Sequence, residues 1–149
     1  MQVISSKDNE FVKHIKKLKD KKYRDMNKEF IIEGIKLIRE AIEEKAEIKQ
    51  IVICDNCLDS DIIPKELMYE IAKYECIYVT ENIFKTISDV NTPQGILAII
   101  GRNTTEAEID YSQDIIVALD DIQDPGNLGT ILRTVDSLSL IHISEPTRP

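Results

Sequence analysis

The first hundred residues alternate short apolar runs with amphipathic segments, and this alternation constrains the fold more than any other feature. Four runs have the length and composition of β-strands, and they cover 29–33, 50–54, 76–80 and 95–100. Apolar residues three or four positions apart predict helices between them. The predicted helices run from Ser6 or Asp8 to about Arg24, and over 35–45, 65–73 and 81–88. This order predicts a three-layer α/β domain with a mostly parallel sheet over residues 1–100.

A second segment follows a polar stretch at 101–113, which has the composition of a linker. The run 115–119 is continuously apolar, as in a strand covered on both faces. A Pro-Gly pair then predicts a sharp turn, and Asn127 is a suitable cap for the helix that follows. This arrangement would place Asn127 and Arg133 near the carboxyl end of a strand, where open α/β sheets bind ligands. The planar guanidinium of Arg133 suits phosphate or ribose oxygens, although an ordinary strand–turn–helix would explain the same residues.

The formal net charge of −8 argues against a nucleic-acid partner, but the charges are unevenly distributed. Residues 1–39 carry eleven basic and six acidic side chains, a local net charge of +5. A basic face indicates an RNA partner better than the total charge does. The alternative is that these side chains only keep a helix surface hydrated. The candidate RNA-binding residues are Lys13, Lys16, Lys17, Lys21, Lys22 and Arg24.

The chain has no apolar stretch near the ~18 residues of a membrane span, and its first residues lack the pattern of a secretion signal. Three cysteines, an odd number, fit a reducing compartment, so we expect a cytoplasmic protein with no membrane partner. Cys54 and Cys57 have Cys-x-x-Cys spacing but follow a predicted strand, and both histidines are distant in sequence. We therefore expect neither a metal site nor a redox pair.

The stretch around Asn127 resembles a known motif. Asp-Pro-Gly at 124–126 precedes the pattern Asn-x-Gly-x-x-x-Arg, which is formed by Asn127, Gly129 and Arg133. This is similar to motif 1 of the SpoU/TrmH branch of the SPOUT RNA methyltransferases. The resemblance implies methyl transfer from S-adenosylmethionine to a ribose 2′-hydroxyl of rRNA or tRNA. It also implies that 114–136 are the first strand, loop and helix of an incomplete SPOUT (α/β knot) domain. In this family pattern Arg133 would activate the ribose and hold its phosphate, and Asn127 would fix the loop or the ribose.

The first domain resembles the L30e-like substrate-binding domain that precedes the SPOUT domain in many SpoU enzymes. The residues that carry this likeness are the stretches 19–24, 30–34 and 92–96. The resemblance implies that residues 1–100 bind RNA. Members of the family are typically homodimers through the C-terminal domain.

The last residues, 137–149, depart from the family and contain two prolines that interrupt regular structure. We expect a non-family tail there. The second and third family motifs, which bind S-adenosylmethionine, have no counterpart in the chain, so we expect no cofactor-binding residues and no activity from this fragment alone. Three interpretations follow: a fragment of an RNA 2′-O-ribose methyltransferase, a non-catalytic L30e-like RNA-binding module, or a small α/β protein with no RNA role.

Overall fold

The computed structural model describes residues 3–58, 62–102 and 115–138. The chain divides into two compact units, Met1–Thr104 and Thr105–Pro149. In chain order, the elements are β1 (Val3–Ile4), α1 (Glu10–Lys17), α2 (Lys21–Asn27), β2 (Glu29–Glu33), α3 (Ile35–Glu43), β3 (Ile48–Cys54), η1 (Asp55–Cys57), α4 (Lys65–Ile71), β4 (Cys76–Val79), α5 (Glu81–Ile87), β5 (Ile96–Gly101) and α6 (Pro125–Ser137).

The first unit is built on a five-stranded sheet with the strand order β1-β4-β3-β5-β2. Strand β4 is parallel to both β1 and β3, whereas β5 is antiparallel to both of its neighbours, β3 and β2. The sheet is therefore mixed, and the prediction of a mostly parallel sheet is wrong. A strand buried on both faces is apolar whichever way it runs, so its sequence does not encode its direction.

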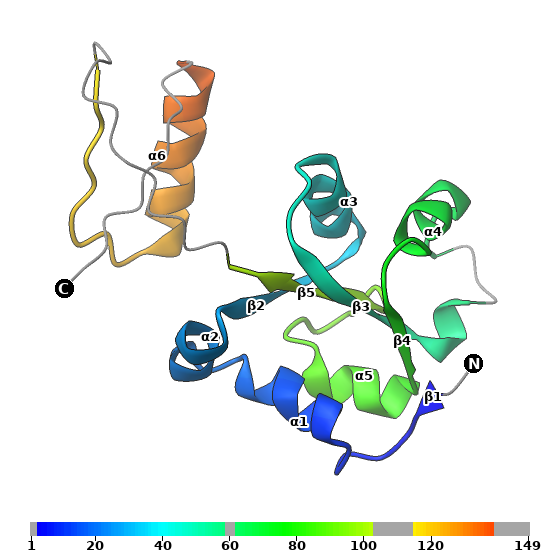
Figure 1. Cartoon of the computed structure of the whole chain (residues 1–149). Helices are drawn as coiled ribbons and strands as arrows, with labels where there is room; N and C mark the ends of the chain where they lie inside the picture. The colour runs from blue at the N-terminus through cyan, green and yellow to red at the C-terminus, as the bar shows by residue number, and fades with distance from the viewer. Residues whose placement is uncertain (1–2, 59–61, 103–114, 139–149) are drawn as a thin grey trace. The chain divides into compact units, whose positions relative to one another are not determined.

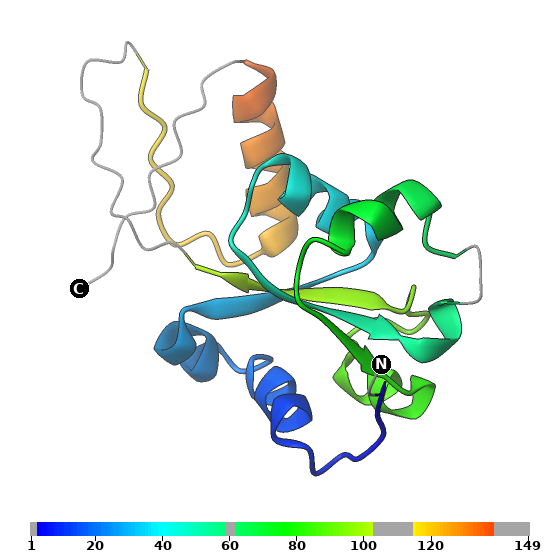
Figure 2. The same cartoon turned by 45° about the vertical axis from the view of Figure 1, so that its right-hand side comes forward.

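Helices cover both faces of this sheet and give the three layers expected of the α/β domain (Figure 1, Figure 2). Helices α3 and α4 lie on one face, and α1 and α5 lie on the other. β3 and β5 are neighbouring inner strands of the sheet. Every residue of β5 and the last four residues of β3 are buried. The core between the layers is almost entirely aliphatic, with Phe84 of α5 as its largest side chain.

The predicted helix ending near Arg24 is in fact two helices, α1 and α2, with a break at 18–20. Asp20 causes a new helix to begin, because its side chain accepts a hydrogen bond of 2.9 Å from the backbone N–H of Lys22. Short polar side chains compete with the helix for backbone donors in this way. The apolar spacing alone does not contain this information. Strand β1 was also not predicted, because two residues are too few to show a periodicity.

In the second unit, the described residues contain the single helix α6 and no strand. The run 115–119, predicted to be a buried strand, is irregular there, and its first residue, Ile115, is 58% exposed. A strand buried on both faces needs neighbouring strands and covering helices. Residues 115–138 supply one helix only, and none of them is buried. The predicted linker from residue 103 onward and the predicted tail beyond residue 138 lie outside the described residues.

Within the described ranges, no helix combines the length and the apolar character that crossing a membrane requires.

Candidate nucleic-acid interface

Lysine side chains on α1 and α2 form the candidate interface. Among the described residues, the ammonium groups of Lys16, Lys21 and Lys22 make no hydrogen bond or ion pair, so they are free to bind a ligand. Lys17 lies over the ring of Tyr23, with Nζ 5.7 Å from the ring centroid, which is a cation–π contact between α1 and α2. The structure thus places these four predicted lysines on two consecutive helices without burying any of their charges.

The fifth lysine, Lys13, is paired with Glu10 of the same helix, with 2.9 Å between Nζ and Oε1. This hydrogen bond and the charge of the partner raise the pKa of Lys13 and lower the pKa of Glu10. Exposed pairs at this spacing contribute little to stability. A phosphate could therefore replace the carboxylate at small cost.

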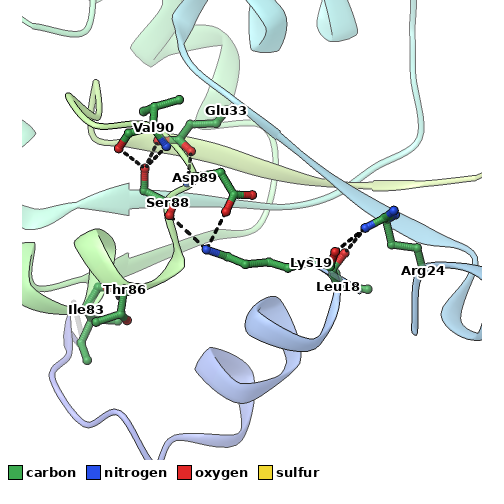
Figure 3. A network of polar contacts seen from close by, with 9 residues as sticks. All are labelled: Leu18, Lys19, Arg24, Glu33, Ile83, Thr86, Ser88, Asp89 and Val90. Atoms are coloured by element: carbon green, nitrogen blue, oxygen red, sulfur yellow. Dashed lines mark hydrogen bonds and ion pairs between the residues drawn. The ribbon is translucent and has the colours of Figure 1, made fainter. Parts of the chain in front are cut away.

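Arg24 differs from the lysines because its guanidinium turns back toward the chain (Figure 3). Its Nη1 donates to the carbonyl oxygens of Leu18, at 3.0 Å, and Lys19, at 2.7 Å. These carbonyls follow the last turn of α1, and no backbone N–H of the described residues donates to either of them. Arg24 therefore has a structural role at the break between α1 and α2, which the sequence analysis did not anticipate.

A second network, also missed by the sequence analysis, ties the end of α1 to the loop after α5 (Figure 3). Lys19 Nζ lies 2.7 Å from Asp89 Oδ1 and 3.0 Å from the carbonyl oxygen of Ser88. Glu33, at the end of β2, accepts hydrogen bonds from Ser88 Oγ at 2.6 Å and from the backbone N–H of Asp89 at 3.1 Å. Ser88 is 55 positions from Glu33. No local sequence pattern indicates a contact over that separation.

Two of the stretches that resemble the L30e-like domain meet in front of α3. Gly34 has φ of +100°, and its N–H donates to the carbonyl oxygen of Ile96 at 3.0 Å. The side chain of Gln94 accepts the backbone N–H of Ile35 at 2.9 Å, which satisfies a donor at the first turn of α3. The two stretches therefore build the turn that joins β2 to α3 and fix it against the start of β5.

Cys54 and Cys57 are buried next to this turn and contribute to packing. A Cβ atom at Gly95 would collide with Cys57 Sγ, so the thiol occupies the space that a glycine leaves open. Burial raises the pKa of Cys54 to about 11 and also raises the pKa of Cys57. A reactive or metal-binding cysteine needs the opposite shift. No group of three potential metal-binding side chains occurs in the part of the chain that the structure describes.

In the second unit, the sequence predicts Asn127 as the cap of α6, but in the structure Asp124 caps this helix. Asp124 Oδ1 accepts the backbone N–H groups of Gly126 at 2.6 Å and of Asn127 at 3.0 Å. Pro125 occupies the first helical position, where its missing N–H costs nothing. The carboxylate that stands directly before the proline thus takes the capping role, and Asn127 lies within the first turn with its side chain exposed.

Arg133 lies exposed on α6 and points back toward the start of the helix. Its Nη2 donates to Thr130 Oγ1 at 3.2 Å, and that hydroxyl donates to the carbonyl oxygen of Gly126 at 2.9 Å. A Cβ atom at Gly129 would lie 3.4 Å from Nη1, so this glycine leaves the space beside the guanidinium open. Among the described residues Arg133 has no acidic partner and no hydrogen bond to Asn127, and its charge is available to a ligand.

Residues 115–138 do not enclose a ligand of the size of S-adenosylmethionine. Enclosing a cofactor of this size requires buried side chains around it. Residues 115–138 contain no buried residue, so this part of the second unit encloses nothing.

Comparisons with known proteins show which proteins this chain is similar to. The family model described as "MRM3-like substrate binding domain" matches residues 9–98. The 23S rRNA (guanosine(2553)-2′-O)-methyltransferase RlmP of Bacillus subtilis (strain 168) is 34% identical over 140 residues, covering 94% of this chain and 52% of that protein. The mitochondrial rRNA methyltransferase 3 of Xenopus tropicalis is 31% identical over 121 residues, covering 77% of this chain and 28% of that protein.

Among solved structures, an AdoMet-bound rRNA methyltransferase from Sinorhizobium meliloti matches with a TM-score of 0.71 and 30% identity. The match covers 91% of this chain and 51% of that one. This chain therefore spans about half the length of the bacterial relatives it matches.

Proposed function

This chain belongs to the family of MRM3-like substrate-binding domains, and from that premise we propose that its first unit is the rRNA-binding part of an rRNA 2′-O-ribose methyltransferase. It is a homologue of SpoU/TrmH-family rRNA 2′-O-methyltransferases. We further propose that the first unit has the L30e-like fold and that residues 114–136 begin the catalytic SPOUT domain. The observation that carries this proposal is the exposed Arg133 on a capped helix, where it is the last residue of a motif that the family resemblance assigns to catalysis.

In the complete enzyme Arg133 would act on the acceptor ribose. A 2′-hydroxyl is a weak nucleophile because it holds its proton tightly, and it must be aligned and activated. A guanidinium is a poor base because it resists deprotonation, but its fixed charge stabilises a developing alkoxide and grips the adjacent phosphate. Thr130 restricts the rotation of the guanidinium, and Gly129 leaves space beside it. Asn127, in the first turn of the same helix, would fix the loop or the ribose.

RNA affinity would come from the first unit. Lys13, Lys16, Lys17, Lys21 and Lys22 would contact phosphates, which is a sequence-independent interaction that weakens with salt. The overall excess of acidic residues then keeps binding from spreading over the rest of the surface.

The test is a chimera in which residues 1–136 of this chain replace the matching half of the Bacillus subtilis relative. With tritiated S-adenosylmethionine, we expect the chimera to methylate 23S rRNA and Arg133→Ala to reduce turnover by about a thousandfold, as for the loss of one transition-state contact of this kind. Arg133→Lys keeps the charge but loses the planar fork of donors, so it should restore only a small part of the turnover that Arg133→Ala loses. Leu132→Ala, at an exposed neighbour on α6, is the matched control.

Unchanged methylation by the folded Arg133→Ala chimera would refute the catalytic assignment. It would leave the alternative of a non-catalytic RNA-binding module, which is favoured by the compact core confined to the first unit.

A further inference from the structure

We propose that Arg24 is a positioning residue, whose guanidinium holds α1 and α2 in a fixed relative orientation and thereby sets the arrangement of the lysines on both helices. This inference rests on the proposed RNA-binding function of the first unit. It changes the role expected for Arg24, which the sequence analysis grouped with the phosphate-binding lysines.

The first argument is the use of its donors. Both hydrogen bonds come from Nη1, which has only two N–H groups, and they go to the adjacent carbonyls of Leu18 and Lys19. The fork that Nη1 and Nη2 would offer end-on to a phosphate is therefore unavailable. The side chain begins on α2 and ends on the last carbonyls after α1, so it bridges the break between the two helices directly (Figure 3).

The second argument is that several other contacts hold the residues around the break between α1 and α2. Asp20 caps α2 through Lys22 N–H, Lys17 contacts the Tyr23 ring, and Lys19 is held by Asp89. The residues that connect α1 to α2 are thus tied to α2 and to the loop after α5. Ordering a site before its ligand arrives reduces the entropy lost on binding. Replacing Arg24 by lysine keeps the positive charge but removes the planar guanidinium that makes the two hydrogen bonds.

The third argument is the distribution of the proposed phosphate-binding lysines. Lys13 and Lys16 lie on α1, whereas Lys21 and Lys22 lie on α2, so the two groups are separated by the break that Arg24 bridges. Neighbouring phosphates of an RNA backbone are covalently linked, so the distances between them fall in a limited range. Both groups can bind one RNA at the same time only if the orientation of the helices matches that spacing.

The experiment uses the 149-residue chain and a fluorescein-labelled fragment of 23S rRNA, with affinity measured by fluorescence anisotropy over a series of salt concentrations. We expect Arg24→Lys and Arg24→Ala to weaken binding by the same factor, because both lose the bridge. Lys22→Gln is the matched control. It should make the salt dependence weaker, reducing the magnitude of the slope of log affinity against log salt by about 0.9, as for one lost phosphate contact. An Arg24→Lys variant with wild-type affinity would show that Arg24 acts as a phosphate ligand and would overturn the proposal.

A second measurement does not depend on RNA. Residual dipolar couplings of the backbone amides of α1 and α2 should fit one alignment tensor in the wild type and require two in Arg24→Lys, with Lys22→Gln unchanged from the wild type. Couplings in Arg24→Lys that match the wild type would overturn the positioning role. Absence of RNA binding by the wild type would instead reject the proposed function, and the couplings would still decide whether Arg24 fixes the two helices.

Discussion

Gly95 is the residue whose identity the fold constrains most. It is buried, its φ is +75°, and a Cβ atom would collide with the sulfur of Cys57. Its carbonyl oxygen also accepts the backbone N–H of Cys54 at 2.8 Å, so the backbone cannot move away easily. Both the conformation and the space at this position therefore require glycine.

We predict that Gly95→Ala lowers the free energy of unfolding by roughly 2–4 kcal/mol, the sum of a left-handed backbone strain and an overpacked core. Urea unfolding followed by circular dichroism measures this change. Gly101→Ala is the control, because its new methyl group would meet only the flexible ends of the Glu47 and Lys49 side chains. Equal stability of the two variants would contradict the structure around Cys57.

The helices and strands show how far the sequence predicts this fold. The strand at 29–33 is found with the same bounds, and the other three predicted strands of the first unit overlap β3, β4 and β5. These runs are recognisable because burial imposes an apolar composition. The predictions of a mostly parallel sheet, of one continuous helix up to Arg24 and of a strand at 115–119 were wrong. Each of these features depends on contacts with other elements or on one capping bond, and hydropathy records neither.

The candidate site divides in the same way. The lysines of α1 and α2 and the exposed Arg133 could be selected from the sequence, because charge and helical spacing suffice for that. The bridging role of Arg24 and the contacts of Ser88 with Glu33 could not, since they depend on how the chain folds back on itself.

At the level of elements, we predict that Asp20→Ala destabilises the first unit by about 1 kcal/mol, because α2 loses its N-terminal cap. The loss should appear as a lower melting temperature and as faster hydrogen exchange of the Lys22 amide. Asp8→Ala removes the same charge from outside any helix and should change neither quantity. Unchanged exchange at Lys22 in Asp20→Ala would mean that the cap does not hold the start of α2.

For the whole molecule, the separation into two units has a direct consequence for binding. All buried residues of the described chain belong to the first unit, and the proposed phosphate contacts lie on its helices. The first unit therefore has its own hydrophobic core, as an independently folding domain requires.

We predict that residues 1–102 alone fold cooperatively and bind rRNA with the same affinity and salt dependence as the 149-residue chain. Thermal unfolding and fluorescence anisotropy measure the two properties. The matched comparison is the double variant Lys21→Gln, Lys22→Gln in both lengths, which should reduce the salt slope equally, by about 1.8. A large loss of affinity in the shortened chain, with folding intact, would move the RNA contacts to the second unit.

The position of β5 also determines when this domain can form during synthesis. Among the described strands β2 pairs only with β5, and β5 is the last strand of this sheet to leave the ribosome. Until residue 101 has emerged, β2 has no neighbour and β3 lacks its partner on one side. β2 therefore stays unpaired over some seventy residues of translation, and during this interval its apolar side chains are exposed to chaperones.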